Sequence, residues 1–142
     1  MKYDDASWHY GGDFPSDLPH ENGATHIAMF LAWAITRDLL GEMHLEDPED
    51  RSDAEAVKQR DADPREVFLK WCDEKLTDED LSEEGNAFAS SYYENRYYVD
   101  LEETVPYKGN SVYRIENSWE NYELMFKVLD RRFEEWRRRV AR

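Results

Sequence analysis

The sequence is short of residues that cross-link a fold, and it has no long apolar run. Cys72 is the one cysteine in 142 residues, so no disulfide can form within the chain, and a reducing compartment is expected. The first residues are charged and polar, unlike the apolar core of a secretory signal. The longest unbroken apolar run, residues 27–35, has nine residues, about half the length that crosses a bilayer. These absences predict a cytoplasmic protein without a membrane-spanning segment.

The spacings that mark common metal, nucleotide and nucleophile sites are also missing. The four histidines are His9, His20, His26 and His44, and no pair has the His-x-x-x-His spacing of a helical zinc site. No G-x-G-x-x-G, P-loop or G-x-S-x-G motif occurs. Cys72 falls on the apolar face of an expected helix, where a thiol usually only packs. The sequence therefore predicts no catalytic residue, no metal ligand and no cofactor.

Positive charge is scarce relative to negative charge. The chain has 33 Asp and Glu against 18 Lys and Arg, a net charge of −15. Residues 41–84 contain 17 acidic and 6 basic side chains, whereas residues 131–142 contain 6 Arg and 2 Glu. A field of this sign repels nucleic-acid phosphates and anionic lipids, and it attracts basic surfaces. We therefore expect a basic protein partner, with no direct nucleic acid or membrane contact, unless the acidity only keeps the chain soluble.

Apolar and aromatic residues are present in the amounts that a helical core needs. They make up 40% and 14% of the chain, too much for a disordered protein. Residues 117–140 carry apolar side chains at steps of three and four, which is typical of an amphipathic helix. Residues 23–40 are apolar on almost every side and should form the central helix. The sequence predicts a mainly α fold: one domain over residues 1–142, a bundle of about five helices with an extended N-terminal arm and at most one short β element.

Caps and periodicity set the expected limits of these elements. Helices are expected over residues 23–40, 63–76, 83–104 and 117–140, with a further helix start at Thr77. Residues 1–21 form the arm, and residues 42–63 form an acidic loop or a short helix beginning at Ser52. Residues 112–115 could form one short strand.

The opening stretch KYDDASWHYGGDFP, residues 2–15, concentrates aromatic and acidic side chains. Trp8, Tyr10 and Phe14 occupy even positions, so in an extended arm they point the same way. We expect them to pack against the central helix, with His9 and Asp13 held at the surface.

Two candidate sites follow from these patterns. The first is an acidic surface made by residues 45–50 and 73–84, which could steer a basic partner. It comprises Glu46, Asp47, Glu49, Asp50, Asp78, Glu79, Asp80, Glu83 and Glu84. The second is a small-molecule-binding or catalytic pocket at the opening stretch, where His9 and His26 could meet with Asp5 or Asp13. It comprises Trp8, His9, Tyr10, Asp13 and His26.

The tyrosine run YYENRYY at residues 92–98 offers a third hypothesis, a self-associating structural protein. Tyrosine is enriched at interfaces, but four tyrosines on one helix cannot all face one core. We expect Tyr92 and one neighbour to pack inside, while the others form a partly exposed flank.

Three stretches together resemble an uncharacterised family of small, acidic bacterial proteins. They are KYDDASWHYGGDFP at the start, ATHIAMFLAWAI at residues 24–35 and ENSWENYELMFKVLDRRFEEW at residues 116–136. The resemblance implies a bacterial, cytoplasmic, single-domain protein similar to immunity proteins of toxin systems, and it assigns no catalytic residue. Together with the acidity, it makes an immunity protein that occludes the active surface of a basic toxin domain the leading hypothesis.

Overall fold

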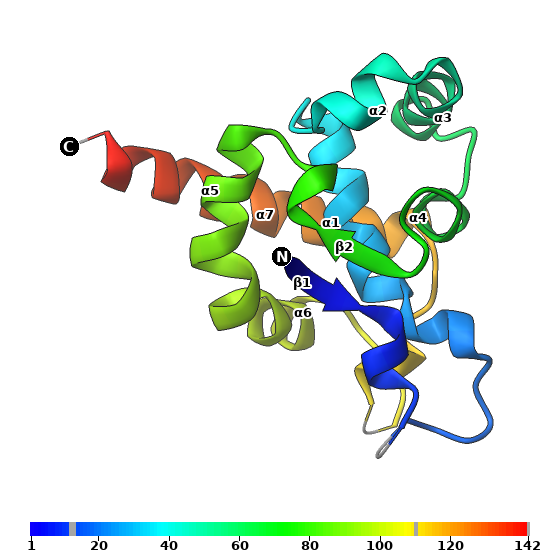
Figure 1. Cartoon of the computed structure of the whole chain (residues 1–142). Helices are drawn as coiled ribbons and strands as arrows, with labels where there is room; N and C mark the ends of the chain where they lie inside the picture. The colour runs from blue at the N-terminus through cyan, green and yellow to red at the C-terminus, as the bar shows by residue number, and fades with distance from the viewer. Residues whose placement is uncertain (12–13, 110, 142) are drawn as a thin grey trace.

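One apolar helix lies at the centre of the fold. The computed structural model describes residues 1–11, 14–109 and 111–141. Helix α1, Thr25–Thr36, is buried along almost its whole length (Figure 1). Its sequence is apolar on nearly every side, so other elements must cover all of its faces. The fold is mainly α, as the sequence predicts.

The other helices surround α1 from three directions (Figure 1). Helices α2, α3 and α4 lie on one side of it and α5 and α6 on the other, while α7 passes behind α1 and projects beyond α5. Their bounds are Glu42–Glu46 for α2, Pro48–Lys58 for α3, Pro64–Cys72 for α4, Glu83–Tyr92 for α5, Tyr98–Thr104 for α6 and Trp119–Val140 for α7.

Side-chain caps fix where several helices begin. Asp63 accepts a hydrogen bond from the backbone N–H of Arg65 at 2.9 Å, which confirms the predicted start of α4. Asp47 caps α3 in the same way, so this helix begins before Ser52 and the acidic segment 42–63 is largely helical. Thr77 and Asp80 form the predicted capping box, but it opens only a short 3-10 turn, Asp78–Asp80.

The N-terminal arm is tied to the rest of the chain by backbone pairing. Strand β1, Lys2–Asp5, pairs antiparallel with β2, Lys75–Thr77. The strand expected over residues 112–115 is instead a 3-10 turn, Val112–Arg114. The small β element of the fold is therefore this two-stranded sheet, and residues 2–5 of the arm form one of its strands.

The expected orientation of the arm side chains is wrong. Residues Ala6–His9 form a 3-10 helix, whose period of three differs from the period of two of an extended arm. Trp8 consequently points outward with 59% of its surface exposed, whereas His9 points inward to a polar cluster. Phe14 does pack at the arm, against Tyr10 and Tyr113, while Asp13 lies outside the described residues.

The tyrosine run is more buried than the sequence suggests. Tyr92, Tyr93 and Tyr97 are each at most 5% exposed, and Tyr98 is partly buried. The reason is a π-helical turn, Tyr93–Tyr97, between α5 and α6, which widens the helix so that more of its side chains face inward. An exposed tyrosine flank for self-association is therefore not formed here.

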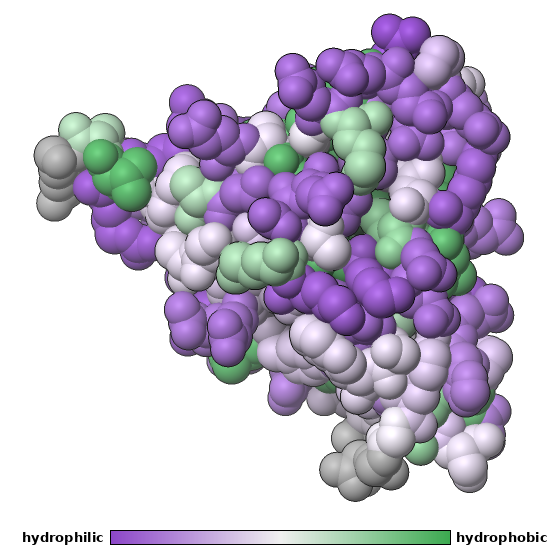
Figure 2. Space-filling model, viewed as in Figure 1, coloured by the Kyte–Doolittle hydropathy of each residue, from purple (hydrophilic) through white to green (hydrophobic). Residues whose placement is uncertain are grey.

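Polar side chains dominate the face of the molecule shown in Figure 2. Larger apolar side chains reach the surface only at scattered places within the described residues: Met1, Trp8, Met43, Leu45, Val99 and Val140. None of the helices in that part of the chain combines the length and the hydropathy needed to cross a membrane.

Candidate functional site

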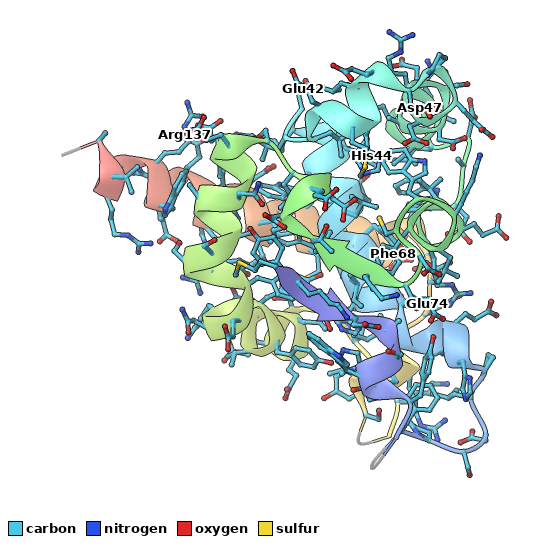
Figure 3. The ribbon with its side chains drawn as sticks, in the orientation of Figure 1. Glu42, His44, Asp47, Phe68, Glu74 and Arg137 are labelled. Carbon is cyan, nitrogen blue, oxygen red and sulfur yellow. The ribbon has the colours of Figure 1, made fainter. Side chains whose placement is uncertain are left out.

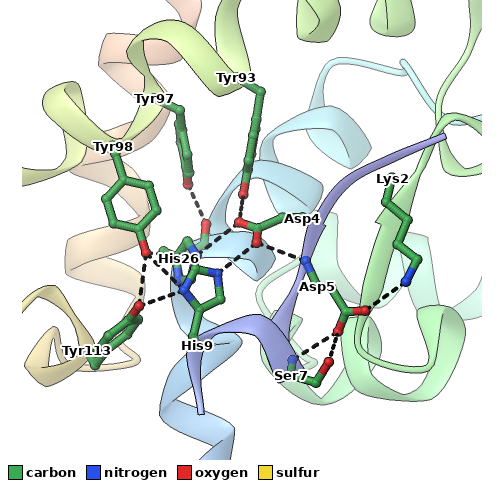
Figure 4. A network of polar contacts seen from close by, with 10 residues as sticks. All are labelled: Lys2, Asp4, Asp5, Ser7, His9, His26, Tyr93, Tyr97, Tyr98 and Tyr113. Atoms are coloured by element: carbon green, nitrogen blue, oxygen red, sulfur yellow. Dashed lines mark hydrogen bonds and ion pairs between the residues drawn. The ribbon is translucent and has the colours of Figure 1, made fainter. Parts of the chain in front are cut away.

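A buried carboxylate, Asp4, is the centre of the most convergent group of polar side chains (Figure 4). Asp4 Oδ1 lies 2.7 Å from His9 Nε2, and Oδ2 lies 3.1 Å from His26 Nε2. Tyr93 donates its hydroxyl to Oδ2 at 2.7 Å, and the backbone N–H of Asp5 donates to Oδ1 at 2.8 Å. We call Asp4, His9, His26, Tyr93, Tyr98 and Tyr113 the Asp4 cluster.

Local structure at the arm explains how Asp4 and His9 meet. Burial increases along β1: Tyr3 is partly exposed, whereas Asp4 and Asp5 are both buried, and the pairing with β2 is irregular between Lys2 and Asp4. Asp5 caps the following 3-10 helix, because its Oδ1 accepts from Ser7 N at 2.9 Å. That helix turns the chain back so that His9 faces Asp4.

Two further tyrosines hold the histidines from the opposite side (Figure 4). Tyr113 Oη lies 2.6 Å from His9 Nδ1. Tyr98 Oη lies 3.4 Å from that same nitrogen and 3.5 Å from His26 Nε2. Tyr97 also donates its hydroxyl to the backbone carbonyl of His26, in the first turn of α1. The cluster thus joins the arm, the central helix, the π-helical turn and the loop before α7.

Burial and hydrogen bonding set the charges of this cluster. Burial alone would raise the pKa of Asp4, but the hydrogen bonds from His26, His9 and Tyr93 outweigh it and hold that pKa well below its ordinary value. Burial lowers the pKa of His26, and it raises the pKa values of Tyr93 and Tyr98. At neutral pH the centre is therefore one carboxylate facing a neutral imidazole and protonated hydroxyls, an arrangement suited to holding a cation.

A second polar cluster surrounds His44. Its Nδ1 lies 2.8 Å from Asp50 Oδ2, and its Nε2 lies 2.7 Å from Asp80 Oδ1. The ring of His44 stacks on that of Trp71, with ring centroids 4.3 Å apart. Cys72 Sγ lies 3.5 Å from Asp80 Oδ1. Burial lowers the pKa of His44, but the two carboxylates outweigh it and raise that pKa above its ordinary value. His44 is thus held as a cation between two anions.

The predicted acidic surface is divided between exposed and internal carboxylates. Glu46, Glu79 and Glu83 are exposed, whereas Asp80 is 2% exposed and, like Asp50, faces His44. The four other members of the predicted set serve as a cap or in ion pairs within the chain: Asp47 as the α3 cap, Glu49 with Lys70, Asp78 with the terminal amine and Glu84 with Arg137. Asp80 therefore stabilises the fold and cannot face a partner.

Only part of the predicted N-terminal pocket comes together. His9 and His26 do meet, but with Asp4 rather than with Asp5. Trp8 points away, and Tyr10 donates its hydroxyl to Glu74 at 2.6 Å. Sequence reasoning missed four members of the Asp4 cluster: Asp4, Tyr93, Tyr98 and Tyr113. Asp4 was visible only as half of one acidic pair among many, and no periodicity connects Tyr98 and Tyr113 to residues near the N-terminus.

A comparison with protein-family models places the chain in a family. A protein-family model described as Domain of unknown function (DUF7832) matches residues 2–115, which include every member of both polar clusters and end before α7. No curated protein and no solved structure matches the chain.

Proposed function

The chain belongs to the DUF7832 family, a family of unknown function, and we propose that it binds a basic protein partner through an acidic surface. The observation that carries the proposal is the meeting of two exposed acidic segments that lie far apart in the sequence. Glu42 and Glu46 on α2, Glu79 on the Asp78–Asp80 turn and Glu83 at the start of α5 make up this surface.

Backbone contacts hold the two segments side by side. The N–H of Gly41, just before α2, donates to the carbonyl of Asp80 at 3.0 Å. Leu40 and Leu81 form an isolated antiparallel bridge. The bond between His44 and Asp80 adds a side-chain link. The relative position of the acidic segments is therefore fixed by the fold before any partner arrives.

The carboxylates of this surface are available to a partner. Glu42 projects from α2 into solvent, whereas His44 lies on the inner side of the same helix (Figure 3). Across the described residues, Glu42, Glu46, Glu79 and Glu83 form no ion pair. Exposed charge of one sign speeds association with an oppositely charged protein, and this attraction becomes weaker as the salt concentration rises and screens the charges.

Exposed apolar side chains flank the acidic ridge of α2. Met43 is 46% exposed and Leu45 is 52% exposed. With His44 directed inward, the 100° helical step directs Glu42 and Glu46 outward and sets Met43 and Leu45 on either side of them. Methionine is among the side chains enriched at protein–protein interfaces, so Met43 adds apolar contact area beside the charges.

The finer form of the proposal is toxin immunity. A small acidic domain that covers the basic, substrate-binding surface of a toxin would block it without any catalytic residue or cofactor. Two features support this form: the net charge of −15, and the resemblance to an immunity-like family that the three stretches suggest in the sequence.

The experiment compares two variants of equal net charge. The first carries Glu→Gln at Glu42, Glu46, Glu79 and Glu83; the control carries Glu→Gln at four other exposed positions, Glu94, Glu102, Glu103 and Glu120. Each is used as bait against the host lysate, and proteins retained by the unmodified chain are purified and titrated over a range of salt.

We expect the first variant to weaken binding of a basic protein at least tenfold and the control to change it little. Equal losses in both variants, or an affinity that does not respond to salt, would contradict the proposal. A second copy of this chain could also supply the basic surface, because Arg137, Arg138 and Arg139 are exposed at the end of α7. Light scattering of the pure chain tests for such a dimer. If the unmodified chain forms a dimer and the first variant is a monomer, the acidic surface binds a second copy of this chain and the proposal of a separate basic partner is wrong.

A second candidate is a small-molecule-binding or catalytic role for the Asp4 cluster. His9 lies between a carboxylate and a hydroxyl, with Asp4 on one ring nitrogen and Tyr113 on the other. A base oriented by a carboxylate and facing a hydroxyl is the arrangement of general acid–base catalysis. Ligand screening by NMR tests it: a ligand for this site shifts the ring signals of His9, Tyr98 and Tyr113, and a screen that leaves them unmoved counts against the role.

A further inference from the structure

Two groups of side chains bring three metal-ligating atoms within 4.8 Å of one another in the described part of the chain. They are Asp4, His9 and His26, and His44, Cys72 and Asp80. A cluster of this kind suits a metal best when the negative charge of its carboxylates is not already balanced by cationic partners within the fold. The two groups differ in this respect.

The His44 group is already complete as an ion cluster. Both ring nitrogens of His44 face carboxylates, Asp50 at 2.8 Å and Asp80 at 2.7 Å, so the imidazole carries a positive charge. The Cys72 thiol is kept protonated, because burial raises its pKa. A metal ion would have to displace protons from both side chains in a site whose negative charge is already balanced.

The Asp4 group has a buried carboxylate with no Lys or Arg beside it among the described residues. Three other carboxylates are buried in the described residues: Asp5 pairs with Lys2, Asp80 with His44, and Asp100 with Arg96 and Arg132. Asp4 is bonded instead by two imidazoles, a tyrosine hydroxyl and a backbone N–H. Neither Lys nor Arg contacts it among the described residues.

We propose that Asp4, His9 and His26 bind one divalent transition-metal ion, with zinc as the expected occupant. The ligand atoms are a carboxylate oxygen of Asp4 and the Nε2 atoms of the two histidines (Figure 4). Two imidazoles and one carboxylate form a frequent three-ligand zinc set, and neighbouring ligand atoms about 3 Å apart are normal for bonds of about 2 Å. The two histidine nitrogens lie 2.7 and 3.1 Å from the two oxygens of Asp4, and the three ligand atoms all lie within 4.8 Å of one another.

The surrounding hydroxyls suit such an ion. Tyr113, 2.6 Å from His9 Nδ1, holds the nitrogen that would not bind the metal, and partners of this kind orient a ligating ring. When Nε2 binds the ion, the neutral ring carries its proton on Nδ1, so His9 becomes the donor to Tyr113. Three protein ligands leave a fourth position for water, with the Tyr98 hydroxyl beside it, 3.5 Å from His26 Nε2.

Access is provided through the arm. The side chain of His9 is 14% exposed, while that of His26 is 2% exposed. His9, on the 3-10 helix Ala6–His9 of the arm, is therefore the ligand through which the site reaches the solvent. The ion would then tie the arm to the central helix.

The experiment titrates the metal-free full chain with zinc by calorimetry, and with cobalt(II) by visible absorption. We expect one ion per chain for the unmodified protein. His9→Ala should abolish stoichiometric binding, whereas the controls His20→Ala and Cys72→Ser should retain it. Tyr113→Phe should weaken binding about 10- to 100-fold, because the partner of a ligating ring is lost. The Glu→Gln variant of the acidic surface should bind zinc normally, which separates this site from the proposed partner surface.

NMR spectra of the histidine ring nitrogens test metal binding in the unmodified chain, so the test holds even if a variant fails to fold. In the unmodified chain zinc should shift Nε2 of His9 and His26, leave Nδ1 protonated, and leave His20 and His44 unchanged. Absence of stoichiometric binding, binding retained in a folded His9→Ala variant, or binding lost in Cys72→Ser would each overturn the proposal.

Discussion

His9 and His26 lie edge to face with ring centroids 4.6 Å apart, although they belong to the arm and to the central helix. Asp4 bonds to both rings, so one carboxylate positions two histidines. The arm thereby closes over the first turn of α1 with polar contacts rather than with the aromatic packing that its sequence suggests. This relationship makes Asp4 the most informative position to change.

Asp4→Asn should lower the free energy of unfolding by about 1–3 kcal/mol at neutral pH. The amide would turn an N–H group toward side chains that themselves donate, leaving buried donors unpaired. Chemical denaturation measures the difference, and Asp17→Asn, an exposed carboxylate paired with Arg114, is the control. Because the folded pKa of Asp4 lies below its ordinary 3.8, the advantage of the unmodified chain should shrink as pH falls below that value. A variant as stable as the parent would contradict the assigned charge.

The stabilisation from His44 should be greatest in mild acid. Its folded pKa is raised above the ordinary 6.5, so the contribution is complete below that value and is lost as pH rises through the folded pKa. Asp50, Asp80, Cys72 and Trp71 face the ring from α3, α4 and the turn before α5.

Urea titrations of the unmodified chain and of His44→Gln measure this effect. The difference in unfolding midpoint should narrow from pH 6 toward alkaline pH, because other titrating groups are common to both proteins. A difference that widens with pH would show that His44 is neutral in the folded chain.

Gly41→Ala should destabilise the junction that holds the acidic surface together. A Cβ at this position would lie 2.5 Å from the carbonyl oxygen of Glu79 and 3.0 Å from that of Leu81, so the backbone must shift. Overpacking of this kind costs about 1–3 kcal/mol. Gly11→Ala is the matched control, since nothing lies within 4 Å of its added Cβ. Equal thermal stability of the two variants would argue against the close contact of α2 with the turn before α5.

Trp8→Ala should change the unfolding free energy by less than about 0.5 kcal/mol, because the indole is 59% exposed. The ammonium group of Lys2 lies over the ring, with Nζ 5.6 Å from the ring centroid. Trp8 fluorescence should be quenched readily by added iodide or acrylamide in the folded chain. A loss of stability as large as that of a core truncation would contradict the exposed position and show that Trp8 packs inward.

The helices could be predicted because their signals are local. The Asp63–Pro64 start, the period of residues 117–140 and the apolar stretch before Gly41 each lie within a few turns of chain. The start of α3 was missed although its signal is also local. Asp47 caps the helix and Pro48 follows it, but within the acidic segment Asp47 looked like one more member of an acidic pair. The prediction for the arm was wrong for another reason. Side chains repeat every two residues in an extended backbone and every three in a 3-10 helix, and here Asp5 caps a 3-10 helix at residues 6–9.

The sequence alone determined the mainly α class, the central position of α1 and the acidic balance, because composition and periodicity act along the chain. Tertiary structure alone decided which polar groups meet. Asp4, His26, Tyr98 and Tyr113 converge because the arm pairs with β2 and the π-helical turn redirects the tyrosines, and neither event leaves a regular spacing. Tertiary structure also separated carboxylates that look alike in the sequence: Asp80 is buried against His44, while Glu79 beside it faces solvent.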